Sequence, residues 1–149
     1  MTQEEKDLLL KDLCGRLPYG VKCCIYNFGG NTIRKKEDIL WSVQGDNVLT
    51  LKSYVEKGEA YMYHQIKPYL FPLSSMTNEL WDKEFRGYGI TEYTRDSFKY
   101  DCEILDFNDS NIDLSNMVGF INQLIKHHFD VYELIPLGLA IDATGLNIY

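Results

Sequence analysis

Apolar residues recur at helical spacing over the first part of the chain. The members of this stripe are Leu9, Leu10, Leu13, Cys14 and Leu17. Thr2 and Glu5 supply a T-x-x-E capping box just ahead of it, in which each residue can satisfy a backbone N–H at the helix start. The pattern therefore predicts an N-terminal helix over residues 3 to about 15, which ends near Gly15 and Pro18.

The spacing changes to the period of two that is typical of strands between residues 21 and 66. Turn signals rich in glycine, asparagine and aspartate separate four runs, Val21–Tyr26, Asp38–Gln44, Val48–Tyr54 and Ala60–Ile66. In the second run, alternation assigns Ile39, Trp41 and Val43 to one face. Four short strands in succession predict a small antiparallel four-stranded meander or an SH3-like half-barrel over about 21–66.

The stretch Ile66–Thr77 (IKPYLFPLSSMT) follows the last predicted strand. Pro68 and Pro72 cannot donate to a central ladder, so the strand is expected to end at Ile66. The two aromatic residues of the stretch, Tyr69 and Phe71, are predicted to be exposed and are candidates for contact with a partner.

Two further helices are predicted beyond this stretch. Thr77 is the expected N-cap of a helix over about 78–86, with a hydrophobic staple between Met76 and Trp81. A regular apolar stripe predicts the other helix over about 114–129, with Asp113 as its cap. The whole chain is thus expected to be a single α+β domain, 1–149, which can divide into a β-rich sub-lobe, 1–72, and a helical one, 73–149.

The charge of the chain bears on its partners. The formal net charge is −7 over 149 residues, and the one basic run, Arg34–Lys36, is followed directly by acidic residues. Direct binding to nucleic acid is therefore disfavoured, and a partner protein with a basic surface is favoured. The acidic candidates for this contact are Asp101, Glu103, Asp106 and Asp109, and a solubilising acidic face is the alternative interpretation.

The sequence lacks two features that would direct the protein to a membrane or out of the cell. No apolar run approaches the roughly 18 residues of a membrane-spanning helix. The acidic, amphipathic N-terminus is the opposite of a secretory signal. We therefore expect a cytoplasmic protein, with no membrane partner and with its four cysteines as thiols.

Catalytic and metal-binding motifs were weighed against ordinary structural roles. Ser74 and Ser75 lie in neither G-x-S-x-G nor S-x-x-K. Cys23 and Cys24 are adjacent on a predicted strand, and the pair His127–His128 is adjacent on a predicted helix, so neither pair shares a face. We assign no catalytic, cofactor-binding or metal-binding residue and expect no cofactor. Whether the protein is an enzyme is left open, with the balance against it.

Four stretches occur together in this order: Asp12–Lys22 (DLCGRLPYGVK), Ile66–Thr77, His127–Asp130 (HHFD) and Leu134–Ala140 (LIPLGLA). This pattern resembles a family of short uncharacterised proteins from phages and mobile elements of gut Bacteroidales. The resemblance spans most of the chain, and residues 28–47 and 141–149 diverge from it. The family has no assigned activity, so the resemblance implies a genomic context and no catalytic residues.

These observations lead to three hypotheses. The first is a non-enzymatic binding protein of a phage or mobile element that acts on a host or phage protein in the host cytoplasm. Inhibition of a host defence protein such as a CRISPR nuclease is its sharpest form, based on charge complementarity. The second is a small enzyme with an unrecognised thiol or histidine site. The third is a structural or assembly component of the virion.

Overall fold

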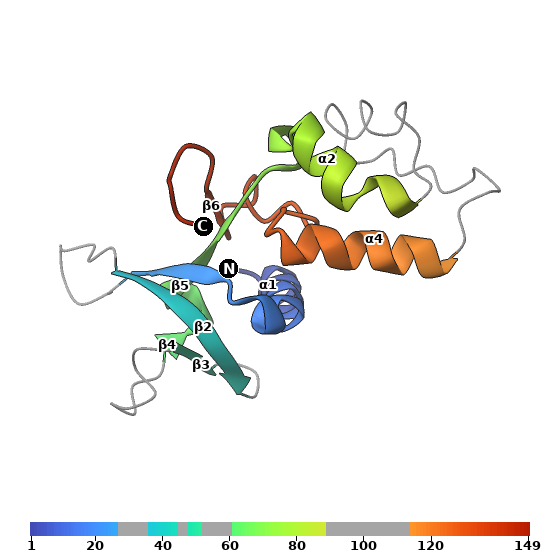
Figure 1. Cartoon of the computed structure of the whole chain (residues 1–149). Coiled ribbons are helices and arrows are strands. Elements are labelled where there is room, and N and C mark those ends of the chain that lie inside the picture. The colour runs from blue at the N-terminus through green and yellow to red at the C-terminus, as the bar shows by residue number, and fades with distance from the viewer. Residues whose placement is uncertain (27–35, 45–47, 52–60, 89–113) are drawn as a thin grey trace. The chain divides into compact units, whose positions relative to one another are not determined.

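The structure is a computed structural model, and it describes residues 1–26, 36–44, 48–51, 61–88 and 114–149 (Figure 1). The fold is α+β, with three α-helices and a mixed six-stranded sheet among these residues. The chain divides into two compact units. Unit 1 comprises Met1–Leu70 and Tyr132–Tyr149, and unit 2 comprises Phe71–Val131. The boundary at 70 lies close to the end of the predicted β-rich sub-lobe, but the C-terminal segment belongs with the sheet.

Helix α1, Gln3–Arg16, begins as its sequence predicts. The Thr2 hydroxyl accepts a hydrogen bond from the Glu5 N–H, and the Glu5 carboxylate accepts one from the Thr2 N–H, which completes the capping box. Gly15 does not end the helix, because helical geometry continues through Arg16 into a short 3-10 turn. The chain reverses at Gly20, whose φ of 67° lies in the left-handed region that glycine tolerates.

The sheet has the strand order β4-β3-β2-β1-β5-β6. The first four strands are β1 (Lys22–Ile25), β2 (Lys36–Gln44), β3 (Val48–Leu51) and β4 (Tyr61–Met62). Each pairs antiparallel with the next, so the predicted meander is present. The predicted fourth strand, Ala60–Ile66, is wrong beyond Met62, because Tyr63–Gln65 form a 3-10 turn and Ile66 begins another strand. The sheet continues beyond it through β5 (Ile66–Leu70) and β6 (Ile141–Asp142), and is therefore larger than the four strands or half-barrel expected.

The expected end of the sheet at Ile66 is wrong, because β5 begins there and contains Pro68. The N–H of Tyr26 donates to the carbonyl of Gln65, so alternation makes Cys24 and Lys67 the next hydrogen-bonded pair. Pro68 lies opposite Cys23 at a position where the ladder with β1 requires no donor. A proline is thus tolerated within this strand.

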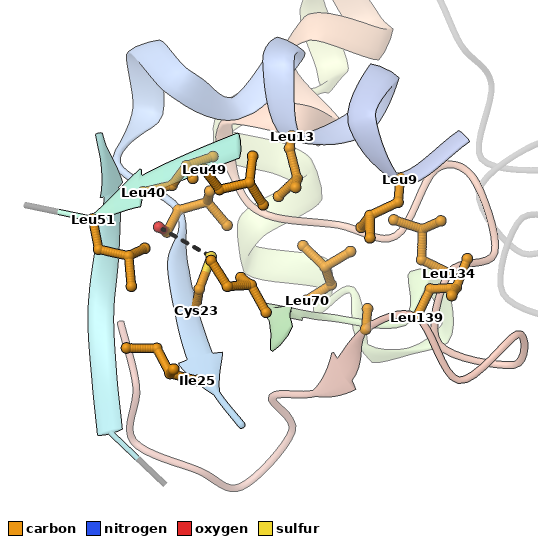
Figure 2. Close-up of a cluster of buried hydrophobic side chains, with 13 residues drawn as sticks. Leu9, Leu13, Cys23, Ile25, Leu40, Leu49, Leu51, Leu70, Leu134 and Leu139 are labelled. Atoms are coloured by element: carbon orange, nitrogen blue, oxygen red, sulfur yellow. Dashed lines mark hydrogen bonds between the residues drawn. The ribbon is translucent and has the colours of Figure 1, made fainter. Parts of the chain in front are cut away.

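The core of unit 1 lies between α1 and one face of the sheet (Figure 2). Leu9 and Leu13 of α1 belong to the same buried cluster as Leu40, Leu49 and Leu51 of the sheet. The C-terminal segment closes the cluster with three further buried residues, Leu134, Leu139 and Ala140. The apolar tail thus packs on the β-rich body, as its composition predicts.

Unit 2 contains α2, Asn78–Glu84, and α4, Leu114–Lys126. The Thr77 hydroxyl accepts the Leu80 N–H at 3.2 Å, which confirms the predicted cap. Met76 and Trp81, the predicted staple, are both buried in one cluster. Its centre is aromatic, with Trp81, Phe85 and Phe120 within 5.5 to 6.0 Å of one another by ring centroid.

Helix α4 ends three residues before the predicted Phe129. His128 has a φ of 62°, a left-handed conformation that cannot continue the helix. The carbonyl of His128 then accepts the N–H of Phe71, and the N–H of Asp130 donates to the carbonyl of Phe71. The predicted cap Asp113 lies outside the described residues.

Candidate protein-binding surface

The two aromatic residues proposed as exposed contacts have different positions in the structure. Tyr69 lies in β5 and is only 2% exposed, so the expectation of an exposed ring there is wrong. Phe71 is half-buried and packs against the cluster of unit 2, with its ring 6.3 Å from that of Phe129 by centroid. Both rings therefore have packing roles. The acidic candidates Asp101, Glu103, Asp106 and Asp109 lie outside the described residues.

Trp41 is a candidate that alternation along β2 does not identify. Its side chain is 57% exposed, the largest exposed fraction among the large hydrophobic residues that the structure describes. The register between β2 and β3 pairs Leu40 with Leu51 and then Ser42 with Thr50, which leaves Trp41 without a partner residue. Trp41 is therefore the extra residue of a β-bulge.

The bulge determines which side chains of β2 point outward. Leu40, before the bulge, is buried, and Val43, beyond it, packs against the same core. The assignment of Trp41 and Val43 to one face is therefore wrong. Val43 lies three positions after Leu40, where strict alternation requires an even number, but the sequence does not reveal this because Ile39, Trp41 and Val43 also keep a period of two.

The face around Trp41 is the one turned away from α1. The hydroxyls of Ser42 and Thr50 hydrogen-bond to each other across the strands at 2.7 Å, and both residues are only half-buried. Met62 of β4 is 39% exposed, whereas its neighbour Tyr61 packs on the core. Trp41 and Met62 thus lie on the same sheet face as the hydroxyls of Ser42 and Thr50, and we call Trp41, Ser42, Thr50 and Met62 the outer face.

An exposed tryptophan on a sheet face is chemically suited to protein contact. Tryptophan carries a large, rigid apolar surface with one hydrogen-bond donor, and it is enriched among residues that dominate binding energy. β-Bulges commonly re-aim a side chain at functional positions. The outer face can therefore present an anchor residue to a partner.

The described cysteines differ in exposure and in reactivity. Cys23 is fully buried, and burial is the main cause that raises the pKa of its thiol well above the usual range, with the Asp12 carboxylate adding to the effect. A thiol with a raised pKa is a poor nucleophile at neutral pH, because the thiolate is the reactive form. Cys14 is exposed and Cys24 is buried. Cys102 lies outside the described residues.

The histidines are separated between the two units. His64 is exposed in unit 1, whereas the neighbouring pair His127–His128 lies in unit 2. The Nε2 of His127 lies 3.5 Å from the Glu84 carboxylate. A hydrogen bond from Lys83, and next to it the contact with His127, holds the pKa of Glu84 below its usual value. In the part of the chain that the structure describes, no three His, Cys, Asp or Glu side chains are grouped so that they could hold a metal ion.

Helix α1 carries a buried ion pair between Asp12 and Arg16. Two oxygens of Asp12 accept hydrogen bonds from the Nε and an Nη of Arg16, both at 2.7 Å, and both side chains are fully buried. Because the two residues are four apart in α1, they lie on the same side of the helix as Leu9 and Leu13. This ion pair belongs to the stretch Asp12–Lys22, so that stretch contains residues with a structural role.

None of the described helices is long and apolar enough to cross a membrane. Comparisons of the chain with protein-family models, curated proteins and solved structures give no match.

Proposed function

We propose that this chain is a non-enzymatic binding protein that docks on a partner protein through the outer face. The exposed Trp41 at the bulge is the observation that carries the proposal. A tryptophan that is 57% exposed has a large apolar surface in contact with water, and covering it would favour association. The bulge lies within a paired strand, so little backbone order would have to be gained on binding.

The charge of the chain supports a particular class of partner. A net charge of −7 favours a protein with a basic surface, since opposite fields speed association and disfavour like-charged partners. Proteins that bind nucleic acid carry such surfaces. In its most specific form, the proposal names a defence nuclease of the host, such as a CRISPR nuclease, as the partner. The resemblance of four motifs to phage and mobile-element proteins supports this setting in the bacterial cytoplasm.

The enzyme alternative receives less support from the described residues. The raised pKa of the Cys23 thiol weakens its candidacy as a nucleophile. The virion-component alternative also predicts a binding surface, but its partner would be another particle protein. The two binding hypotheses therefore differ in the identity of the captured protein.

The experiment compares three versions of the full chain as bait in host and phage-infected lysates: wild type, Trp41→Ala and Leu137→Ala. Leu137 is a matched control, because it is 48% exposed, is apolar and belongs to the same unit. We expect wild type and Leu137→Ala to retain a basic protein that Trp41→Ala loses. Circular dichroism establishes that the three versions are equally folded.

Retention of the same partner by Trp41→Ala would contradict the proposal for this surface. A captured protein that is acidic would contradict the charge argument. For the defence form, the purified chain should block DNA cleavage by the captured nuclease, and Trp41→Ala should not.

A further inference from the structure

The C-terminal residues 141–149 form a separate strap along the outer side of β5. Within it, β6 runs parallel to β5 and pairs Ile141 with Tyr69 and Asp142 with Leu70 (Figure 1). The N–H of Ala143 then donates to the carbonyl of Leu70 at 2.8 Å. The strap therefore binds the edge of β5 by backbone hydrogen bonds, as an added strand does.

The last residue of the strap takes the place of a backbone hydrogen bond between β1 and β5. The register between β1 and β5 ends at Cys23 and Pro68, so the next position pairs Lys22 with Tyr69. There the hydroxyl of Tyr149 accepts the Lys22 N–H at 3.2 Å and donates to the Tyr69 carbonyl at 2.8 Å. A phenol group thus bridges two strands where a direct N–H···O bond would otherwise form. The ammonium of Lys22 also donates to the carbonyl of Ile148.

The strap is held by few buried contacts. Within residues 141–149 only Ala143 is buried, and Leu146 and Tyr149 are each 43% exposed. The strand with which it pairs is more deeply buried, because Tyr69 and Leu70 of β5 are almost completely buried. A segment with little buried apolar surface opens at a lower free energy than the strands it covers.

We propose that the outer edge of β5 is a strand-addition site for an extended peptide of a partner protein, and that residues 141–149 occupy this site in cis until the partner displaces them. The strap defines the peptide chemistry. A small apolar residue fills the position of Ala143, and a tyrosine six residues later bridges Lys22 and Tyr69. The site lies at the opposite end of the sheet from β4, so this proposal does not depend on whether the outer face binds a partner.

The first measurement is amide hydrogen exchange by NMR on the full chain. Tyr149→Phe removes the acceptor of the Lys22 N–H, and we expect exchange at Lys22 to rise roughly tenfold, as for the loss of one or two ordinary hydrogen bonds. Exchange at Cys24, inside the ladder, should not change, which shows that the sheet remains folded. Leu146→Ala is the matched control in the strap and should leave both amides unchanged.

The second measurement is the binding of a fluorescent synthetic peptide with the sequence of residues 140–149. The tethered strap competes with it, so the apparent affinity depends on the fraction of molecules in which the strap is open. Peptide affinity should therefore rise in Tyr149→Phe by the same factor as exchange of the Ala143 N–H, which bonds to the Leu70 carbonyl only while the strap is closed, and it should not rise in Leu146→Ala. A peptide with phenylalanine in place of its tyrosine should bind more weakly.

A second variant, Ala143→Asp, opens the strap by a different route, since it places a charge at a buried position. If exchange of the backbone N–H at position 143 rises in either variant and the peptide still does not bind, the strand-addition site is refuted. If exchange rises in neither variant, the strap is a permanent part of the sheet and the proposal also fails.

Discussion

The buried ion pair of Asp12 and Arg16 allows a quantitative prediction about the stability of unit 1. Asp12→Leu would leave the guanidinium of Arg16 buried without its carboxylate, and Arg16→Met would leave the carboxylate without its guanidinium. Loss of one partner of a buried pair costs about 3 to 5 kcal/mol. Since a domain is stable by about 5 to 15 kcal/mol, either change removes a large share of the free energy of unfolding.

The double variant distinguishes the ion pair from simple packing. Replacing both charges with apolar residues of similar size also removes the charge that each single variant leaves without the other member of the pair, and such exchanges are often neutral or stabilising in other proteins. We expect Asp12→Leu with Arg16→Met to be more stable than either single variant, with a coupling free energy of about 2 kcal/mol or more. Both residues suit a helix interior, so propensity does not oppose the exchange.

The assay is urea unfolding followed by circular dichroism for the wild type, both single variants and the double variant. Asp7→Leu is the control on the same helix, because the Asp7 carboxylate makes an exposed hydrogen bond with Gln3 and its loss should cost less than about 0.5 kcal/mol. The reasoning is refuted if each single variant costs less than about 1 kcal/mol or if the double variant costs the sum of the two.

Three further predictions concern single residues. Thr77→Ala removes the cap of α2 and should lower the free energy of unfolding by about 1 kcal/mol, whereas Thr77→Asn should restore it. Gly119→Ala places a methyl group 2.5 Å from the ring of Tyr88, so unfolding should become easier despite a gain in helix propensity of about 1 kcal/mol. Burial raises the pKa of the Tyr149 hydroxyl, so its contribution to stability is complete below its ordinary value of 10.0 and falls as pH rises beyond it. A difference titration of wild type against Tyr149→Phe, followed by tyrosinate absorbance, should show no ionisation of this residue near pH 10.0, and ionisation there would contradict the prediction.

The helix starts could be predicted because their signals are local. The hydroxyls of Thr2 and Thr77 accept backbone N–H groups three residues ahead, and this geometry depends on residues adjacent in sequence. The first three strands and the start of the fourth could also be predicted, since each pairs with its neighbour along the chain. Local rules therefore give these elements correctly.

The remaining features depend on contacts between distant parts of the chain. A proline inside a strand usually ends it, because proline has no backbone N–H to donate to the neighbouring strand. Pro68 is tolerated here because it lies opposite Cys23, where the pairing with β1 requires no N–H donor. The bridge from Tyr149 to Lys22 and Tyr69 joins residues 127 and 80 positions apart. No pattern in the sequence specifies such a contact.

The candidate site was predicted least well. The sequence predicts an exposed ring at Tyr69 because Pro68 suggests that the chain has left the sheet, whereas the strand continues through Leu70 and Tyr69 is buried. Trp41 was placed on a face by strict alternation, which the bulge interrupts. Exposure depends on register, and one extra residue in a strand changes the face of those that follow.

The most direct test of the central claim, that the outer face binds the partner through Trp41, uses the fluorescence of a single tryptophan. The chain has two tryptophans, and Trp81 is buried in unit 2, so Trp81→Phe leaves Trp41 as the reporter. Addition of the captured partner is expected to shift the emission to shorter wavelength and to protect it from acrylamide quenching. If the partner binds this variant with unchanged affinity while emission and quenching stay the same, Trp41 lies outside the interface and the claim is contradicted.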